Sequence, residues 1–316
     1  LMYYASCPLR ISLFGGSSDN PYFIEKYNYG SVISFTCDLK TYVTISQDKI
    51  GFNKQKGKYL INYSKREEVD KVGDIKNEVV RTVLEYFKMP PVQVTLTSDA
   101  YSQGSGLASS SSYTISLIKA CCLFLDIAIK EHDVCKLAYK LERTYNPYCG
   151  YQDPYGCGVG GFKRIEFLNP SRIKYEYLPT DLFNHYDTHL VFTGVTRNSK
   201  KILKNITENL EKVKPVLDTV EHAHNALVAK EYNTFLDYLN ESWVKKKETS
   251  DSITENKKIK KIDKDLENNG SVIAHKLCGA GNGGFFLTFS KKNTLTIPYS
   301  SIKIYAVPDG VKGESI

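Results

Sequence analysis

Two acidic residues near the middle of the chain, Glu142 and Asp153, could share a catalytic task. Glu142 falls at the end of a predicted helix over 132–145, and Asp153 lies eleven positions later, in GYQDPYG. Separated carboxylates can divide their labour, since one can hold a metal ion while the other takes a proton. Glutamates are common on helix surfaces, so the pair by itself does not identify an active site.

A run of small residues, GSGLASSSS at 104–112, stands between a strand-like segment and an apolar helix. The amino end of a helix offers unpaired backbone N–H groups and a positive dipole, which together favour an anion. Small residues let phosphate oxygens approach those groups, and serine hydroxyls can add hydrogen bonds or reach a bound Mg²⁺. The run therefore indicates a phosphate site, although Ser109–Ser112 could instead simply cap the helix.

Two other phosphate-binding patterns can be compared with this run. A Walker A loop requires GxxxxGK[ST], which the chain does not contain. A dinucleotide fingerprint requires G-x-G-x-x-G and an acidic residue about twenty positions later. Gly104, Gly106 and Asp126 satisfy part of this fingerprint, but Ser109 occupies the third glycine position. A NAD-dependent oxidoreductase is therefore a distant alternative.

Two further glycine-bearing segments could approach a ligand closely. In CPLRISLFGGSSD, at 7–19, a strand that carries Arg10 runs into a double glycine, and Asp19 could accept hydrogen bonds from sugar hydroxyls. In KLCGAGNGGFF, at 276–286, four glycines within six positions indicate a loop that closes over a ligand. The first segment could instead be an ordinary turn that contains an aspartate. The second could be an ordinary hairpin or helix–strand turn.

The composition is that of a soluble globular protein with a core of substantial size. The 316 residues include 41% hydrophobic and 24% charged residues, and the formal net charge is +7. This charge suits an anionic ligand but is too diffuse to indicate nucleic acid. The chain has eight cysteines without a CxxC pair, no recognisable signal peptide and no run of 18 apolar residues. We therefore expect a cytoplasmic protein with reduced cysteines and no membrane or nucleic-acid partner.

The order of the predicted strands and helices favours an α+β fold. Apolar alternation predicts strands at 3–14, 31–38, 41–47, 92–99, 162–168, 189–195, 284–290 and 302–307. Apolar spacing of three or four predicts helices after the serine run and at 75–88, 132–145, 199–221, 225–243 and 257–269. Strands and helices do not alternate, which argues against a doubly wound sheet. The pattern of predicted elements changes near residue 180, which predicts a first domain at 1–178 and a second at 179–316. The polar stretch 244–258 is expected to be a solvated connector or a lid.

Together the three glycine-bearing segments and the two carboxylates resemble the GHMP kinase superfamily. That family has an A-P-[GL]-[KR] box on a strand, a P-x-G-x-G-L-G-S-S loop and a G-x-G-G-G box, matched here by CPLR, QGSGLASSSS and GAGNGGF. The order and spacing of the boxes fit across nearly the whole chain. The resemblance implies a two-domain α+β fold with mixed or antiparallel sheets, a ferredoxin-like second domain, and an active site in the cleft between the domains.

A narrower resemblance is to the bacterial D-glycero-D-manno-heptose 7-phosphate kinases. It is carried by RISLFGGSSDNPYF, SGLASSSSYTISLIKA, GYQDPYGCGVGGF and VFTGVTRNSKKIL. It implies transfer of the ATP γ-phosphoryl group to the anomeric hydroxyl, giving a 1,7-bisphosphate for nucleotide-activated heptose and surface polysaccharide. L-Fucokinase-like sugar kinases share parts of the pattern and are the nearest alternative. A family member that binds ligand without catalysis is a further alternative, which the presence of the matching charged residues disfavours.

The resemblance also implies roles for individual residues. Ser110 and Glu142 match the family's Mg²⁺ ligands. Asp153 matches the aspartate beside the acceptor hydroxyl, and Arg10 matches a basic residue whose charge favours the deprotonated acceptor. ATP is expected on Gly104, Ser105, Gly106, Leu107, Ala108, Ser109, Ser110 and Ser111. Contacts to a sugar phosphate are expected from Arg10, Gly16, Ser17, Asp19, Asp153, Gly281 and Arg197, with Lys200 and Lys201 as further candidates for its phosphate. The oligomeric state is expected to be a monomer or a homodimer.

The sequence departs from the family pattern in three places. Ala108 replaces the third loop glycine, Asn282 replaces a glycine of the last box, and Tyr101-Ser102-Gln103 stand where a proline usually precedes the loop. Alanine is small enough to keep the loop open. We therefore expect altered affinity rather than lost activity.

Overall fold

The structure is a computed structural model that describes residues 1–48, 57–100, 104–169, 172–196 and 199–316. Arg197 and the segment 101–103 lie outside the described residues. Strands and helices gather around two sheets and do not alternate along the chain, which confirms the predicted α+β class. Within the described ranges, no helix is long and apolar enough to span a bilayer.

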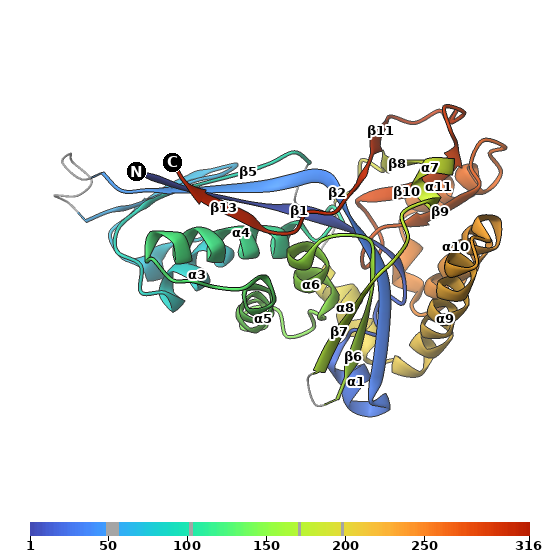
Figure 1. Cartoon of the computed structure of the whole chain (residues 1–316), viewed down its shortest axis with the longest axis horizontal. Helices are drawn as coiled ribbons and strands as arrows, with labels where there is room; N and C mark the ends of the chain where they lie inside the picture. The colour runs from blue at the N-terminus through green and yellow to red at the C-terminus, as the bar shows by residue number, and fades with distance from the viewer. Residues whose placement is uncertain (49–56, 101–103, 170–171, 197–198) are drawn as a thin grey trace.

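The larger sheet is built on two long antiparallel strands, β1 (Met2–Phe14) and β2 (Tyr29–Ser46), which cross most of the molecule in Figure 1. Its order is β13–β1–β2–β5–β3–β4, with β6 and β12 also paired to β2 and β7 paired to β6. The remaining strands are β3 (Tyr59–Asn62), β4 (Arg66–Val69), β5 (Gln93–Ser98), β6 (Lys163–Leu168), β7 (Arg172–Tyr177), β12 (Ala306–Val307) and β13 (Lys312–Ser315). β3 and β5 pair in parallel, so the sheet is mixed.

Helices cover the larger sheet beneath β1 and β2 in Figure 1. They are α3 (Glu78–Tyr86), α4 (Ser109–Phe124), α5 (Glu131–Glu142) and α6 (Gln152–Val159), while α1 (Pro21–Tyr27) lies between β1 and β2 in sequence. Two hydroxyls fix the start of α4 on the sheet, because Ser112 Oγ donates to the carbonyl of Cys7 at 2.8 Å and lies 2.7 Å from Thr41 Oγ1. The buried apolar residues of α4, such as Ile115 and Ile118, fill the core under the sheet.

The smaller sheet is antiparallel, with the order β11–β8–β10–β9. Its strands are β8 (Tyr186–Phe192), β9 (Ala274–Leu277), β10 (Phe285–Lys291) and β11 (Ser301–Ile304). The helices of this half are α7 (Leu182–His185), α8 (Ser199–Thr207), α9 (Lys214–Val228), α10 (Tyr232–Glu248) and α11 (Lys257–Glu267). Short 3₁₀ helices lie at Val72–Asp74, Leu210–Val213 and Asp251–Thr254. The proposed domain division at residue 178 stays a prediction.

The pairing of β1 with β2 is irregular near Arg10. The register of β1 against β2 shifts between Pro8 and Arg10 and again between Ser12 and Phe14. The backbone N–H of Arg10 instead donates to the carbonyl of Leu107 at 3.2 Å. Such irregularities re-aim side chains, and here they join the first glycine-bearing segment to the serine-rich loop.

Three sequence-based expectations about the second half of the chain are wrong in detail. The single helix predicted over 199–221 is broken into α8, a 3₁₀ turn and α9, because Pro215 in the first turn of α9 has no N–H to continue a helix. The stretch 244–258 is mostly helical rather than a connector. The segment 302–307 is divided between two sheets, and a further strand, β13, follows it and pairs with β1.

A buried ion cluster holds α10, α11 and β9 together. Asp263 accepts hydrogen bonds from Trp243 Nε1 at 2.7 Å, from His275 Nε2 at 2.8 Å and from Lys247 Nζ at 2.8 Å. Burial alone would raise the pKa of Asp263, but these donors outweigh it and lower the pKa to about 2. Successive residues of a strand point to opposite faces, so His275 in this cluster leaves Lys276 facing the other way.

We expect Asp263→Asn to lower the free energy of unfolding by about 2–3 kcal/mol, because a buried hydrogen-bonded charge is lost while its partners remain. The native pKa lies below the ordinary value of about 4, so the contribution is present above pH 4 and disappears as the pH falls toward 2. Urea unfolding of both proteins measures it. A difference between them that stays constant from pH 6 to below about 3 would contradict this role.

Candidate active site

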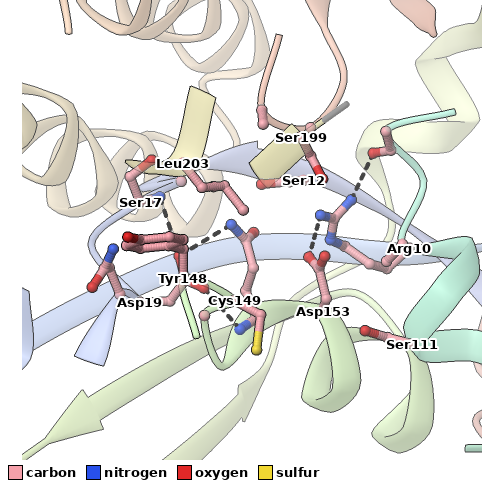
Figure 2. A pocket seen from close by; sticks show the side chains of 18 of the residues that line it. Arg10, Ser12, Ser17, Asp19, Ser111, Tyr148, Cys149, Asp153, Ser199 and Leu203 are labelled. Carbon is pink, nitrogen blue, oxygen red and sulfur yellow. Dashed lines mark hydrogen bonds and ion pairs between the residues drawn. The ribbon is translucent and has the colours of Figure 1, made fainter. Parts of the chain in front are cut away.

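One pocket lies where the ends of several elements from both halves of the chain meet. Figure 2 shows Arg10 and Asp153 in its middle, with Ser111 on one side and Asp19 on the other. The sequence-predicted site residues that line it are Arg10, Gly16, Ser17, Asp19, Gly104, Ser105, Gly106, Ala108, Ser109, Ser110, Ser111, Glu142 and Asp153. Residues far apart in the chain are thus gathered around a single cavity.

The serine-rich loop leaves the amino end of α4 open toward this pocket. Ala108 is the N-cap of the helix, with a φ of 60°, and no side chain makes a capping hydrogen bond there. Gly104 and Gly106 also have positive φ, of 67° and 77°, which glycine adopts without strain. A helix end that is not capped by its own side chains is suited to an anion. This geometry argues against the alternative that Ser109–Ser112 serve only as a cap.

The members of the loop have different surroundings. Ser105 Oγ and Ser109 Oγ lie 2.9 Å apart and are buried, which stiffens the loop. Ser110 is exposed at the pocket. The side chain of Leu107 is fully buried in the core and does not line the pocket, so only its backbone could meet a nucleotide.

Glu142 is a buried carboxylate at the end of α5. It is 4% exposed, and Ser111 Oγ lies 2.8 Å from both of its oxygens, with Thr114 Oγ1 at 3.5 Å. Burial raises the pKa of Glu142 to about 8, and the charge of Asp153 adds to this effect while the bond from Ser111 opposes it. Ser111 therefore contacts Glu142 directly, and the expected role of Ser110 as a Mg²⁺ ligand stays a prediction.

The surroundings of Glu142 fit a magnesium ion that arrives with a nucleotide. Mg²⁺ is commonly held by one or two carboxylates together with substrate phosphates. In the described part of the chain, no three His, Cys, Asp or Glu side chains are grouped to hold a metal by themselves. A carboxylate whose charge is disfavoured by burial would gain from a cation beside it.

Arg10 and Asp153 form an ion pair at the centre of the pocket. The Nη2 group of Arg10 donates to Asp153 Oδ1, and its Nη1 group donates to the carbonyl of Gly106 at 3.0 Å. Burial by itself would lower the pKa of Arg10, but the Asp153 carboxylate outweighs it and raises the pKa above its ordinary value. Arg10 is 3% exposed, whereas the Asp153 side chain is 42% exposed to the pocket. Asp153 is therefore the member of the pair that a substrate can reach.

Asp19 is fixed on the opposite side by a clamp of N–H groups. Its oxygens accept hydrogen bonds from the backbone N–H groups of Ser17 at 3.1 Å and Gln152 at 3.0 Å, and from Gln152 Nε2 at 3.1 Å. Burial raises the pKa of Asp19, although the Gln152 backbone bond opposes the rise. The close packing needs a glycine, since a Cβ on Gly150 would lie 1.9 Å from Asp19 Oδ2.

The third glycine-bearing segment closes against the serine-rich loop. A Cβ on Gly284 would lie 2.3 Å from the carbonyl oxygen of Ser105, and Gly284 has a φ of 89°. Asn282, which departs from the family pattern, adopts a φ of 56° and accepts a hydrogen bond from the N–H of Asn256 at 2.8 Å. Asparagine tolerates this conformation better than most residues, so the departure is structurally accommodated.

Some predicted residues lie away from the pocket. Gly281 packs against Ile253 and does not line the cavity, where its neighbours Gly279 and Ala280 do. Lys200 and Lys201 are exposed and are also absent from the lining, and Arg197 lies outside the described residues.

The geometry also excludes a dinucleotide fingerprint at this loop. Asp126 follows the far end of α4, a helix of 16 residues, which places it about 24 Å from the glycines. A ribose contact from Asp126 is therefore impossible while the loop holds the phosphates. The sequence-based alternative of a NAD-dependent oxidoreductase is wrong.

The sequence analysis missed several polar residues of the pocket, among them Ser12, Gln152, Lys246 and Lys276. Lys246 lies in the run VKKKET, which is typical of a solvated helix face, yet it continues the apolar spacing of Leu239 and Trp243. That spacing was the available signal for an inward-facing lysine.

The comparisons with known proteins agree with this geometry. Residues 75–161 match the GHMP kinases N terminal domain. A D-glycero-alpha-D-manno-heptose 7-phosphate kinase of Campylobacter jejuni is 30% identical over 302 residues, which cover 89% of this chain and 87% of that protein. The chain belongs to the GHMP kinase family. It is accordingly an ATP-dependent sugar kinase.

More remote similarities support the fold of this GHMP kinase. A Bacteroides fragilis L-fucokinase/L-fucose-1-P guanylyltransferase is 27% identical over 63% of this chain and 22% of that protein. A solved D-glycero-D-manno-heptose 1-phosphate kinase from Bacteroides thetaiotaomicron superposes with a TM-score of 0.77 and 20% identity, over 99% of both chains. A Lactococcus lactis galactokinase complexed with galactose reaches a TM-score of 0.77 with 16% identity, over 98% of this chain and 95% of that chain. These structures confirm the α+β fold with mixed and antiparallel sheets.

We expect Gly284→Ala to raise the KM for ATP by about tenfold, because the added methyl group pushes the last glycine-bearing segment away from the phosphate loop. Steady-state kinetics with varied ATP measure this effect. Gly270→Ala is the matched control, since nothing lies within 4 Å of its added methyl group. An unchanged KM for ATP in a folded Gly284→Ala protein would contradict the role of this contact.

Proposed function

We propose that this GHMP kinase transfers the γ-phosphoryl group of ATP to the anomeric 1-hydroxyl of D-glycero-D-manno-heptose 7-phosphate. The product is the 1,7-bisphosphate, a precursor of nucleotide-activated heptose for surface polysaccharide. The observation that carries the proposal is the Arg10–Asp153 pair, which lies in one pocket between the open end of α4 and the Asp19 clamp. The name of the Campylobacter jejuni relative supports the choice of sugar.

The proposed roles follow from the surroundings of each side chain. The backbone N–H groups at 104–111 bind the nucleotide phosphates, and Glu142 with Ser110 or Ser111 provides oxygen ligands for Mg²⁺. When bound, Mg²⁺ neutralises charge on the transferring phosphoryl group. Asp153, exposed to the pocket, accepts a hydrogen bond from the acceptor hydroxyl and orients it for attack.

Arg10 holds the Asp153 carboxylate in position. A guanidinium paired with a carboxylate makes a charge-assisted hydrogen bond of defined geometry. The second Arg10 bond, to the carbonyl of Gly106, links the position of Asp153 to the phosphate loop. The side chain of Arg10 therefore fixes the position of the acceptor hydroxyl relative to the γ-phosphoryl group. Such positioning supplies most of the catalysis in phosphoryl transfer.

The experiment that tests the substrate is a coupled assay of ADP formation with purified enzyme, ATP and Mg²⁺. The acceptors are D-glycero-D-manno-heptose 7-phosphate, the corresponding 1-phosphate, unphosphorylated heptose, L-fucose and galactose. We expect the highest kcat/KM with the 7-phosphate, and phosphorus NMR should show a new phosphate at C1. Preferred turnover of L-fucose would instead support the fucokinase-like alternative, and preferred turnover of the 1-phosphate would reverse the position of transfer.

We expect Asp153→Asn to reduce kcat by about 100- to 10,000-fold, because the variant cannot accept a proton or carry charge beside the acceptor. Nucleotide affinity should change little, since Asp153 does not belong to the phosphate loop. Isothermal titration with an ATP analogue and circular dichroism separate a chemical defect from a folding defect. A folded Asp153→Asn enzyme with wild-type turnover would contradict the assignment.

A further inference from the structure

Three hydrogen-bond donors that line the pocket, from Ser12, Gln152 and Lys246, converge over Gly16 and form a small cradle. A methyl group on Gly16 would lie 3.7 Å from Gln152 Nε2, 3.8 Å from Ser12 Oγ and 3.9 Å from Lys246 Nζ. These side chains come from α6, β1 and α10, so three distant parts of the chain converge on one point. Glycine leaves that point open, and all four residues line the pocket.

The hydroxyl of Ser12 has no hydrogen-bond partner within the protein. Ser12 is 4% exposed, and its Oγ atom is buried and unpaired. A buried hydroxyl without a partner is costly, and native proteins rarely leave one unless a ligand or water satisfies it. Since this hydroxyl faces the open point above Gly16, it indicates a group that accepts hydrogen bonds there.

Positive charge surrounds the same point. Lys246 is 9% exposed and donates to Ser17 Oγ at 2.5 Å and to the carbonyl of Gly16 at 3.5 Å. Lys276, also 9% exposed, donates to the carbonyls of Ser12 and Leu13 at 2.8 and 3.2 Å. Burial lowers the pKa of Lys276 to about 7, and the charges of Lys246 and Arg10 act in the same direction. An anion in the cradle would relieve this repulsion.

The negative groups nearby are already engaged. The oxygens of Asp19 accept three N–H groups, and Asp153 is paired with Arg10. The charge of Lys246 acts on Asp19 as well. Neutral sugar hydroxyls could bond to Ser12 and Gln152, but they would bring no further negative charge to the buried Lys246 and Lys276. An anionic oxygen can accept hydrogen bonds from the Ser12 hydroxyl and from Gln152 Nε2, which also donates to Asp19, and it brings negative charge to Lys246.

We propose that Ser12, Gln152 and Lys246, gathered over Gly16 and supported by Lys276, bind the phosphate group that the acceptor sugar already carries. This inference rests on the proposed function, because it assumes a phosphorylated acceptor. Ser12 lies on the Asp19 side of the Arg10–Asp153 pair, and Ser111 of α4 lies on the other side (Figure 2). The cradle accounts for selection of a sugar phosphate over a free sugar without the exposed residues Lys200 and Lys201.

Gly16→Ala and Lys246→Met test the cradle in complementary ways. The backbone of Gly16 is outside the left-handed region, and its added methyl group would make only ordinary contacts, so the variant should fold. It fills the open point, whereas Lys246→Met removes the charge. Lys245→Met is the matched control, because Lys245 pairs with Glu241 at 2.6 Å and does not line the pocket.

The measurement is the KM of each protein for heptose 7-phosphate, for the same heptose without phosphate, and for ATP. We expect Gly16→Ala and Lys246→Met to raise the KM for the phosphorylated sugar by about 10- to 100-fold, the effect of losing a charge-assisted hydrogen bond. The KM values for ATP and for the free sugar should stay within about twofold of wild type, and Lys246→Arg should recover part of the loss.

The outcomes of these measurements distinguish the proposed phosphate subsite from the proposed function. An unchanged KM for heptose 7-phosphate, an equal rise for both sugars, or a rise confined to ATP would overturn the cradle while the proposed function stands. A wild-type enzyme that uses only unphosphorylated sugars would overturn the proposed function, and the phosphate subsite with it.

Discussion

The pairing of buried Arg10 with Asp153 is the constraint on which the rest of the site depends. A guanidinium that is 3% exposed must have a charged partner and hydrogen bonds, or the fold would bear a large desolvation cost. Arg10 meets this requirement with one carboxylate from α6 and one carbonyl from the phosphate loop. The same contacts that make its burial tolerable therefore tie three elements, β1, α6 and the loop before α4, into a fixed arrangement.

The two sides of this pair use different chemistry. Toward α4, the site offers backbone groups, small hydroxyls and a carboxylate whose pKa is raised to about 8 by burial, an arrangement that favours phosphates accompanied by a cation. Toward Asp19, it offers side-chain donors and lysine charge. Close approach at Gly150 and Gly284 holds both sides against the centre, so a larger residue at either position would displace the atoms packed against it.

The local parts of this architecture could be predicted from the sequence, and the long-range parts could not. The α+β class and the helix after the serine run follow from apolar periodicity and small-residue composition, which are local signals. Lys246 turns toward the pocket, whereas its neighbours Lys245 and Lys247 pair with Glu241 and Asp263; this difference depends on how α10 packs against β1 and β9. Likewise, the contact of Ser111 rather than Ser110 with Glu142 is set by the rotation of α4 on the sheet, which Ser112 fixes through Cys7 and Thr41.

The most direct test of the central claim is a crystal structure of the enzyme with Mg²⁺, a non-hydrolysable ATP analogue and heptose 7-phosphate. The γ-phosphoryl group should lie between the amino end of α4 and Arg10, with the anomeric oxygen about 3 Å from Asp153 and in line with the phosphorus atom. A complex in which the nucleotide phosphates avoid the loop at 104–111, or in which the anomeric oxygen faces away from Asp153, would contradict it.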